Sequence, residues 1–145
     1  MRNNQQRNFG RNNKTNFKDK MPEKISVPLS KLYQDKTKIF LDTGIAYKTA
    51  EKMGDIPPHQ LRKILNELKD AVALAHTDFE KARNKIYYIV PLTAYNFGRN
   101  KKIKDLYDFV YTHINENYIT CEADIIVLDQ LFTSIIAYHK CFKSL

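Results

Sequence analysis

Four histidines and two cysteines are the side chains of this 145-residue sequence best suited to catalysis or metal binding. The histidines are scattered along the chain, and neither Cys121 nor Cys141 pairs with a histidine at a spacing typical of zinc sites. The four glycines match neither a phosphate-binding loop nor a dinucleotide-binding pattern. The sequence therefore predicts no catalytic residue, no metal ion and no cofactor.

Two features resemble catalytic groups but have simpler explanations. His139 falls on the apolar face of the last predicted helix, where a hydrogen-bonded core histidine is the favoured interpretation. Residues 67–69 (ELK) resemble the end of a metal-dependent nuclease motif. Two-metal chemistry needs several converging carboxylates, and no second carboxylate cluster accompanies this segment. Neither feature changes the prediction that the protein is not an enzyme.

Basic side chains recur at helical spacing, which favours binding of a polyanion. Arg62, Asn66 and Lys69 follow the spacing i, i+4, i+7 along one predicted helix and border its apolar face. Lys48 and Lys52 form a similar pair on the preceding helix. These positions predict a basic stripe that contacts phosphate groups.

A second basic cluster follows the third predicted helix, where four cations fall within residues 99–104: Arg99, Lys101, Lys102 and Lys104. Gly98 is expected to end this helix in the left-handed conformation. Cations after a helix end also stabilise its carbonyl groups, so helix stability alone is one explanation. The alternative is phosphate binding, because Arg99 continues a face formed by Tyr88, Leu92 and Tyr95 that would hold a guanidinium in place.

The elements that carry these residues are helices, because the apolar residues recur with a helical period and no long segment alternates with period two. The sequence predicts an all-α fold, a compact bundle of about five helices. They begin near Asp42, Pro57, Asp78, Ile103 and Glu122. Asp42, Thr43 and Asp78 are expected to cap helices, Gly54 to end the first one, and Pro57 and Pro58 to occupy the first turn of the second.

The third helix, residues 78–97, is predicted to be the central one. Its apolar residues lie on two opposite faces, and Tyr88, Leu92 and Tyr95 make up the second face. A helix that is apolar on both sides is expected to pack on both sides. Pro91 removes one backbone hydrogen bond and is expected to kink it.

The excess positive charge is concentrated at the N-terminus. The chain carries 24 Lys plus Arg against 16 Asp plus Glu, a net charge of +8, and residues 1–24 contribute seven basic and two acidic side chains. This asparagine-rich segment is predicted to be a disordered basic arm, and residues 25–145 a single domain. The arm is either a solubilising tail or an electrostatic contact for nucleic acid. No apolar run approaches the roughly 18 residues of a membrane helix, so no membrane contact is expected. Two cysteines cannot form a disulfide framework, so a reducing cytoplasm is the expected location.

Three segments together resemble a known family. They are residues 56–63 (IPPHQLRK), residues 91–99 (PLTAYNFGR) and residues 136–140 (IAYHK). In order and spacing they resemble the small helical subunit of type III-A CRISPR effector complexes, the Csm complexes. The resemblance covers roughly residues 42–142 and leaves the arm out.

The resemblance implies a non-catalytic, RNA-binding subunit. It implies contacts with the backbone of guide RNA and of its duplex with target RNA. It also implies stacking with further copies of itself, beside the large polymerase-like subunit and the repeated backbone subunit that cleaves the target. Arg62 and Arg99 match basic positions of the family, whereas charge geometry alone suggests Lys48, Lys52, Lys69, Lys101, Lys102 and Lys104. The alternative is a helical DNA-binding or protein-interaction regulator with a nonspecific basic arm.

Overall fold

The computed structural model describes residues 21–144, and all regular elements among these residues are helical. Two short turns of helix, α2 (Leu29–Leu32) and α3 (Thr37–Phe40), precede five longer helices. These are α4 (Ile45–Lys52), α5 (Pro58–Ala75), α6 (Phe79–Arg99), α7 (Lys104–His113) and α8 (Glu122–Ser144), with a 3₁₀ helix η1 (Lys101–Ile103) before α7. The predicted all-α bundle of about five helices is confirmed. The predicted arm lies outside the described residues, apart from residues 21–24.

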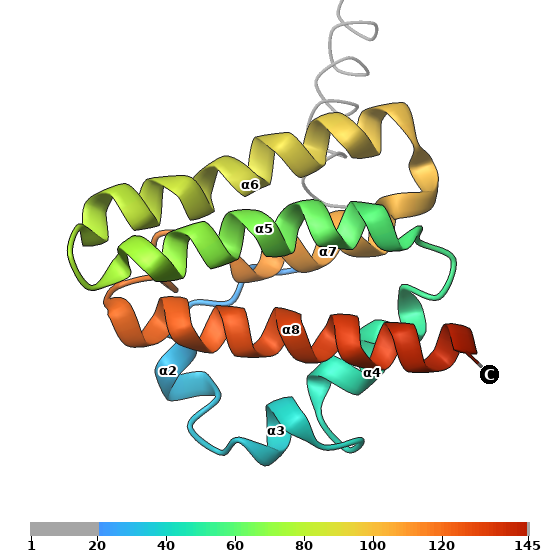
Figure 1. The fold of residues 1–145 in the computed structure, drawn as a ribbon, viewed down its shortest axis with the longest axis horizontal. Helices are drawn as coiled ribbons and strands as arrows, with labels where there is room; N and C mark the ends of the chain where they lie inside the picture. Colours follow the sequence, from blue (N-terminus) through green and yellow to red (C-terminus); the bar gives the residue numbers. More distant parts are fainter. Residues whose placement is uncertain (1–20, 145) are drawn as a thin grey trace, which may run out of the picture.

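The helices form a bundle in which α5 packs between α6 and α8 (Figure 1). The helix α7 packs against α6 and touches α4, while α2, α3 and α4 cover the other side of α8. A short loop joins α5 to α6, so these two helices run antiparallel. The N-terminal end of α5 therefore lies at the same end of the bundle as the C-terminal ends of α6 and α8. This arrangement decides which basic side chains meet.

The central helix is α8, and the prediction that residues 78–97 form the central helix is wrong. The helix α8 contacts α2, α3, α4 and α5, and its buried side chains include Leu128, Leu131 and Phe132. In α6 only one face is buried, against α5 and α7. Tyr88 and Tyr95 on its other face are 59% and 64% exposed, because no helix among the described residues covers them.

The predicted helix starts are partly confirmed. Pro57 is the N-cap of α5 with Pro58 as its first residue, and the Asp78 carboxylate accepts a hydrogen bond from the Lys81 backbone N–H at 3.1 Å. Gly44 caps α4, so the prediction that Asp42 or Thr43 does so is wrong. Met53 follows α4 directly, one residue before the predicted stop at Gly54.

Gly98 does not end α6 as predicted. No described glycine has a positive φ, and Gly98 lies within the helix. The chain turns at Asn100, which has extended backbone angles of φ −141° and ψ 102°. The Asn100 side chain accepts a hydrogen bond from the Lys102 N–H at 3.1 Å, which starts η1. A side-chain turn therefore replaces the glycine stop. The helix α6 continues through Pro91, an exposed proline inside it.

Among the described residues, α8 is the one helix long and apolar enough to cross a membrane by length and composition. Its apolar side chains are used in the core of the bundle, as its contacts with four other helices show. It also contains a fully buried carboxylate, Asp124, which accepts hydrogen bonds from the Ser30 and Thr120 N–H groups at 2.8 Å each. The helix α8 therefore has the properties of a core helix of the bundle.

Candidate nucleic-acid interface

Arg62 lies in the first turns of α5, directly after the buried Leu61. Its side chain is exposed, and it lines a surface cavity of about 190 Å³ together with Lys140 and Lys143 from the end of α8. The cavity floor includes His139, which is buried and whose Nε2 is 3.0 Å from the Met53 carbonyl oxygen. His139 is thus the hydrogen-bonded core histidine predicted from the sequence. The groups of this cavity that could bind an anion are the side chains of Arg62, Lys140 and Lys143.

Arg99 is the last residue of α6, and aromatic contacts restrain it. Its guanidinium lies 5.7 Å from the centroid of the Tyr95 ring, and the Lys101 ammonium lies 4.6 Å from the centroid of the Phe97 ring. Both cations are exposed. The aromatic surroundings predicted for Arg99 are confirmed, although the tyrosine beside it faces solvent.

Helices α4, α5, α6, η1, α7 and α8 each carry basic residues at one end of the bundle, the end at the right of the ribbon in Figure 1. We call this the basic end; it comprises Lys52, Arg62, Arg99, Lys101, Lys102, Lys104, Lys140 and Lys143. The opposite end, at the left of Figure 1, carries acidic residues at the starts of α6 and α8 and in the α7–α8 loop. These are Asp78, Glu80, Glu116 and Glu122. Asp55 and Asp105 also lie near the basic end, and Lys81 and Arg83 lie near the opposite end, so the two ends differ by an excess of cations. That excess favours a polyanion at the basic end.

Ion pairs separate the predicted binding residues into two groups. Lys69 is 2.9 Å from the Asp129 carboxylate of α8, and Lys104 is 2.7 Å from Asp108. Lys69 lies farther along α5 and outside the basic end. The other ion pairs of the described residues involve His76 and Arg83, so Arg62 and Arg99 have no carboxylate partner there.

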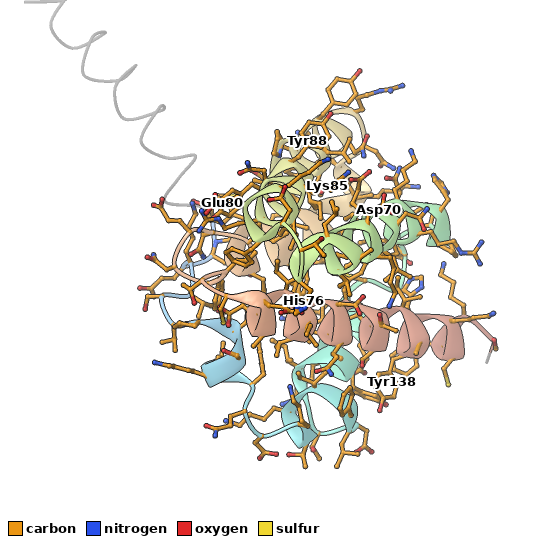
Figure 2. All side chains as sticks on the ribbon, turned by 60° about the vertical axis from the view of Figure 1, so that its left-hand side comes forward. Asp70, His76, Glu80, Lys85, Tyr88 and Tyr138 are labelled. Atoms are coloured by element: carbon orange, nitrogen blue, oxygen red, sulfur yellow. The ribbon has the colours of Figure 1, made fainter. Side chains whose placement is uncertain are left out.

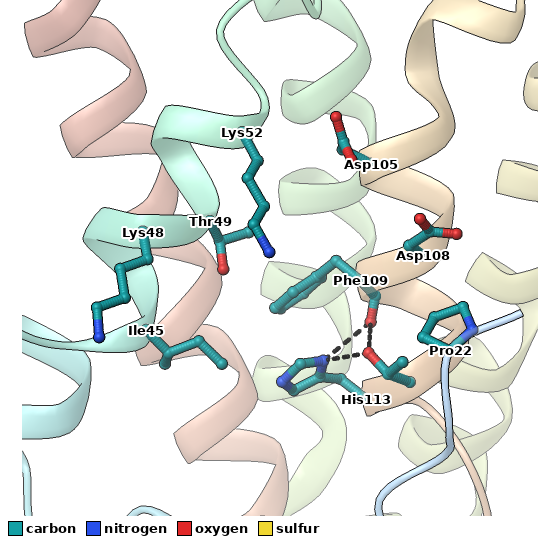
Figure 3. Close-up of a pocket in the computed structure, with 10 residues that line it drawn as sticks. Pro22, Ile45, Lys48, Thr49, Lys52, Asp105, Asp108, Phe109 and His113 are labelled. Atoms are coloured by element: carbon teal, nitrogen blue, oxygen red, sulfur yellow. Dashed lines mark hydrogen bonds between the residues drawn. The ribbon is translucent and has the colours of Figure 1, made fainter.

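Lys48 and Lys52 line a second cavity, of about 360 Å³, between α4 and α7. Asp105 and Asp108 lie on the opposite wall, and His113 lies at its base (Figure 3). Both lysines therefore share the cavity with carboxylates, although Lys48 extends away from α7 in Figure 3. This mixed charge makes the cavity a weaker phosphate site than the basic end.

His113 has the position of a catalytic base in this cavity but the environment of a core residue. It is buried, its Nε2 lies 3.1 Å from the Tyr33 hydroxyl and its Nδ1 lies 3.0 Å from the Phe109 carbonyl oxygen. Burial lowers the pKa of His113 to about 4, so the ring is neutral at pH 7. Since the Phe109 carbonyl can only accept, Nδ1 carries the proton and Nε2 accepts from Tyr33. Both ring nitrogens of His113 are therefore engaged in hydrogen bonds within the protein.

Over residues 21–144, no three His, Cys, Asp or Glu side chains are grouped to hold a metal ion.

The model of the Csm2 type III-A family matches residues 36–144, which is most of the chain. The chain belongs to the Csm2 family. The match extends from α3 to the end of α8 and includes all three segments on which the resemblance was based. No curated protein and no solved structure matches the chain.

Csm2 membership confirms that the protein is a small subunit of a type III-A CRISPR Csm complex. Family and fold agree, since the matched region is the helical bundle itself.

Sequence analysis did not select Lys140 and Lys143, which this Csm2 protein places beside Arg62. The signal was available, since Lys140 ends the third segment of the resemblance and Lys143 follows three residues later on the same helix. Only the packing of α8 along α5 brings them next to the start of α5.

Proposed function

We propose that this protein binds the sugar-phosphate backbone of guide RNA, and of its duplex with target RNA, through the basic end. Arg62 and Arg99 are the principal contacts. Lys101 and Lys102 support Arg99, and Lys140 and Lys143 support Arg62. Lys48, Lys52, Lys69 and Lys104 are secondary, because they share a cavity with carboxylates or pair with them.

The observation that carries this proposal is the convergence of arginines and lysines from separate helices at one end of the bundle, where all but Lys104 lack a carboxylate partner among residues 21–144. Arg62 also stands near the start of α5, where the positive end of the helix dipole favours anions. A guanidinium can bind a phosphate through two parallel hydrogen bonds. Because the Tyr95 ring already restrains Arg99, less side-chain entropy is lost when that arginine binds.

The proposal is tested in the assembled complex with Arg62→Ala and Arg99→Ala, using two unrelated guide sequences over a salt series. Phosphate contacts carry no sequence information, so each variant should weaken RNA binding equally for both guides. A plot of the logarithm of the binding constant against the logarithm of salt concentration has a negative slope. Each variant should make this slope shallower by about 0.7 to 0.9, the value for one phosphate contact.

Arg83→Ala is the matched control, since Arg83 is an arginine of α6 that already pairs with Glu80 at 2.7 Å. It should leave the salt slope unchanged. A loss of binding for one guide alone would indicate base recognition. If Arg62→Ala and Arg99→Ala left the salt slope unchanged but lowered the melting temperature, both arginines would stabilise the fold and would not contact phosphate.

We further propose that the subunit itself is not catalytic and acts in the cytoplasm beside the polymerase-like subunit, the backbone subunit and further copies of itself. In support, the two buried histidines are committed to hydrogen bonds within the bundle. Incubation with labelled RNA and Mg²⁺ or Mn²⁺ should give no cleavage. Cleavage that disappears in His113→Gln would contradict the proposal.

A further inference from the structure

The outward face of α6 exposes two aromatic rings. Tyr88 is 59% and Tyr95 64% exposed, the highest fractions among the exposed large hydrophobic residues of the described chain. They stand seven residues apart, so they share a face of the helix, with the half-buried Leu92 between them. We call Tyr88, Leu92 and Tyr95 the tyrosine face. In Figure 2, Tyr88 lies at the edge of the molecule formed by α6, remote from Tyr138 beyond α8.

Packing within the protein does not account for the tyrosine face. Among residues 21–144, neither ring packs against another aromatic ring, and neither hydroxyl has a hydrogen-bond partner. The Tyr95 ring lies 5.7 Å from the Arg99 guanidinium. Other tyrosines of the chain behave differently, since Tyr33, Tyr107 and Tyr118 are buried. Clustered exposed aromatic residues mark a binding surface.

The charge around the tyrosine face identifies the kind of partner. Lys81 and Lys85 precede Tyr88 by seven and three residues, and Arg99 follows Tyr95 by four, so cations border the rings at both ends of the face. The nearby carboxylate of Glu80 is occupied by Arg83, with N–O distances of 2.7 and 2.8 Å. Aromatic rings flanked by cations and free of unpaired carboxylates suit a nucleic acid better than an apolar protein surface.

We propose that Tyr88 and Tyr95 stack on unpaired bases of a single-stranded RNA segment, while Lys85 and Arg99 contact its phosphates. The inference deepens the proposed function and rests on it. Seven helical residues span about 10 Å, so the rings hold two bases that are not nearest neighbours. Bases in a duplex present their edges and keep their faces stacked, so the rings select unpaired nucleotides.

The test uses the full-length chain at low ionic strength and a single-stranded RNA of about 12 nucleotides carrying 2-aminopurine. Stacking on tyrosine should quench the probe. Tyr88→Leu and Tyr95→Leu keep apolar bulk at exposed positions and remove the ring. Each should abolish part of the quenching and raise Kd for the single strand by about 5-fold or more, with Kd for the annealed duplex unchanged.

Tyr88→Phe and Tyr95→Phe are the matched controls, because they keep the stacking surface and should bind like the unmodified chain. Wild-type affinity and quenching in the Leu variants would overturn the stacking proposal. If Arg62→Ala still made the salt slope shallower in the assembled complex, the proposed backbone function would stand alone. Leu variants that bind RNA normally but fail to assemble with the other subunits would instead make the tyrosine face a protein contact, which also overturns the inference.

Discussion

At the residue scale, the Asp124 carboxylate anchors α2 to the start of α8. It accepts hydrogen bonds from the N–H groups of Ser30, Thr120 and Cys121 and from the Thr120 hydroxyl, at 2.7 to 3.2 Å. Burial opposes its ionisation, but these hydrogen bonds outweigh burial, and the pKa of Asp124 lies below its usual value. The ionised form is therefore the one that stabilises the fold.

Asp124→Asn should lower the free energy of unfolding by about 2 kcal/mol at pH 7, because an amide presents a donor where donors already converge. The carboxylate contribution is present above the unfolded pKa of about 3.9 and lost as pH falls through the lower folded pKa. Urea denaturation followed by circular dichroism measures both effects. Asp70→Asn, on the exposed side of α5, should change little.

His113 gives a second prediction, with a different pH window. Its pKa is about 4 in the folded protein because of burial, against 6.5 when unfolded. The unfolded chain therefore binds the proton first, and stability should fall by about 3 kcal/mol as pH decreases from 6.5 to 4. His113→Gln should be less stable at pH 7 but lose this slope. His59→Gln, at an exposed position, should keep it; equal slopes in all three proteins would contradict the assignment.

At the scale of single elements, two glycines make opposite predictions. A Cβ at Gly98 would meet no atom within 4 Å, whereas a Cβ at Gly44 would press against the backbone carbonyls of Lys38 and Thr37. Gly98→Ala should raise the free energy of unfolding by about 0.5 to 1 kcal/mol, because alanine favours a helix interior. Gly44→Ala should lower the melting temperature, because the α3–α4 turn must open. Thermal unfolding of both variants decides whether Gly98 is helical, since a left-handed glycine would give the reverse sign.

At the scale of the whole molecule, the excess of cations at the basic end is expected to set the salt dependence of the proposed RNA binding. Lys101→Ala combined with Lys102→Ala should make the slope of the logarithm of the binding constant against the logarithm of salt concentration shallower by about 1.4 to 1.8. This change corresponds to two phosphate contacts. Lys31→Ala combined with Lys38→Ala removes the same charge from α2 and α3, outside the basic end. That control should leave the slope unchanged in the same titration. Equal losses in both double variants would mean that net charge, and not its position, determines binding.

Local patterns were sufficient for the helices and for the family. The spacing of apolar residues along 58–75 and 104–113 predicted amphipathic helices, and Pro57, Pro58 and Asp78 predicted two of their starts. These signals act within one or two turns, so they survive in the folded chain. The three segments of the resemblance are likewise local, and the Csm2 match confirmed them. The same periodicity placed Arg62 on a helix beside its apolar face, whereas Arg99 was predicted to follow a helix that ends at Gly98 and is instead the exposed last residue of α6.

Long-range packing decided the rest. Periodicity gave α6 two apolar faces but could not show that one of them lacks a covering helix. The uncharged run from Gln130 to His139 in α8 was the better sign of a central helix. The grouping of Arg62 with Lys140 and Lys143, and the pairing of Lys69 with Asp129, join residues 60 or more positions apart. Such contacts depend on how α5 and α8 pack, because the free energy that selects a helix partner comes from surfaces distant in sequence.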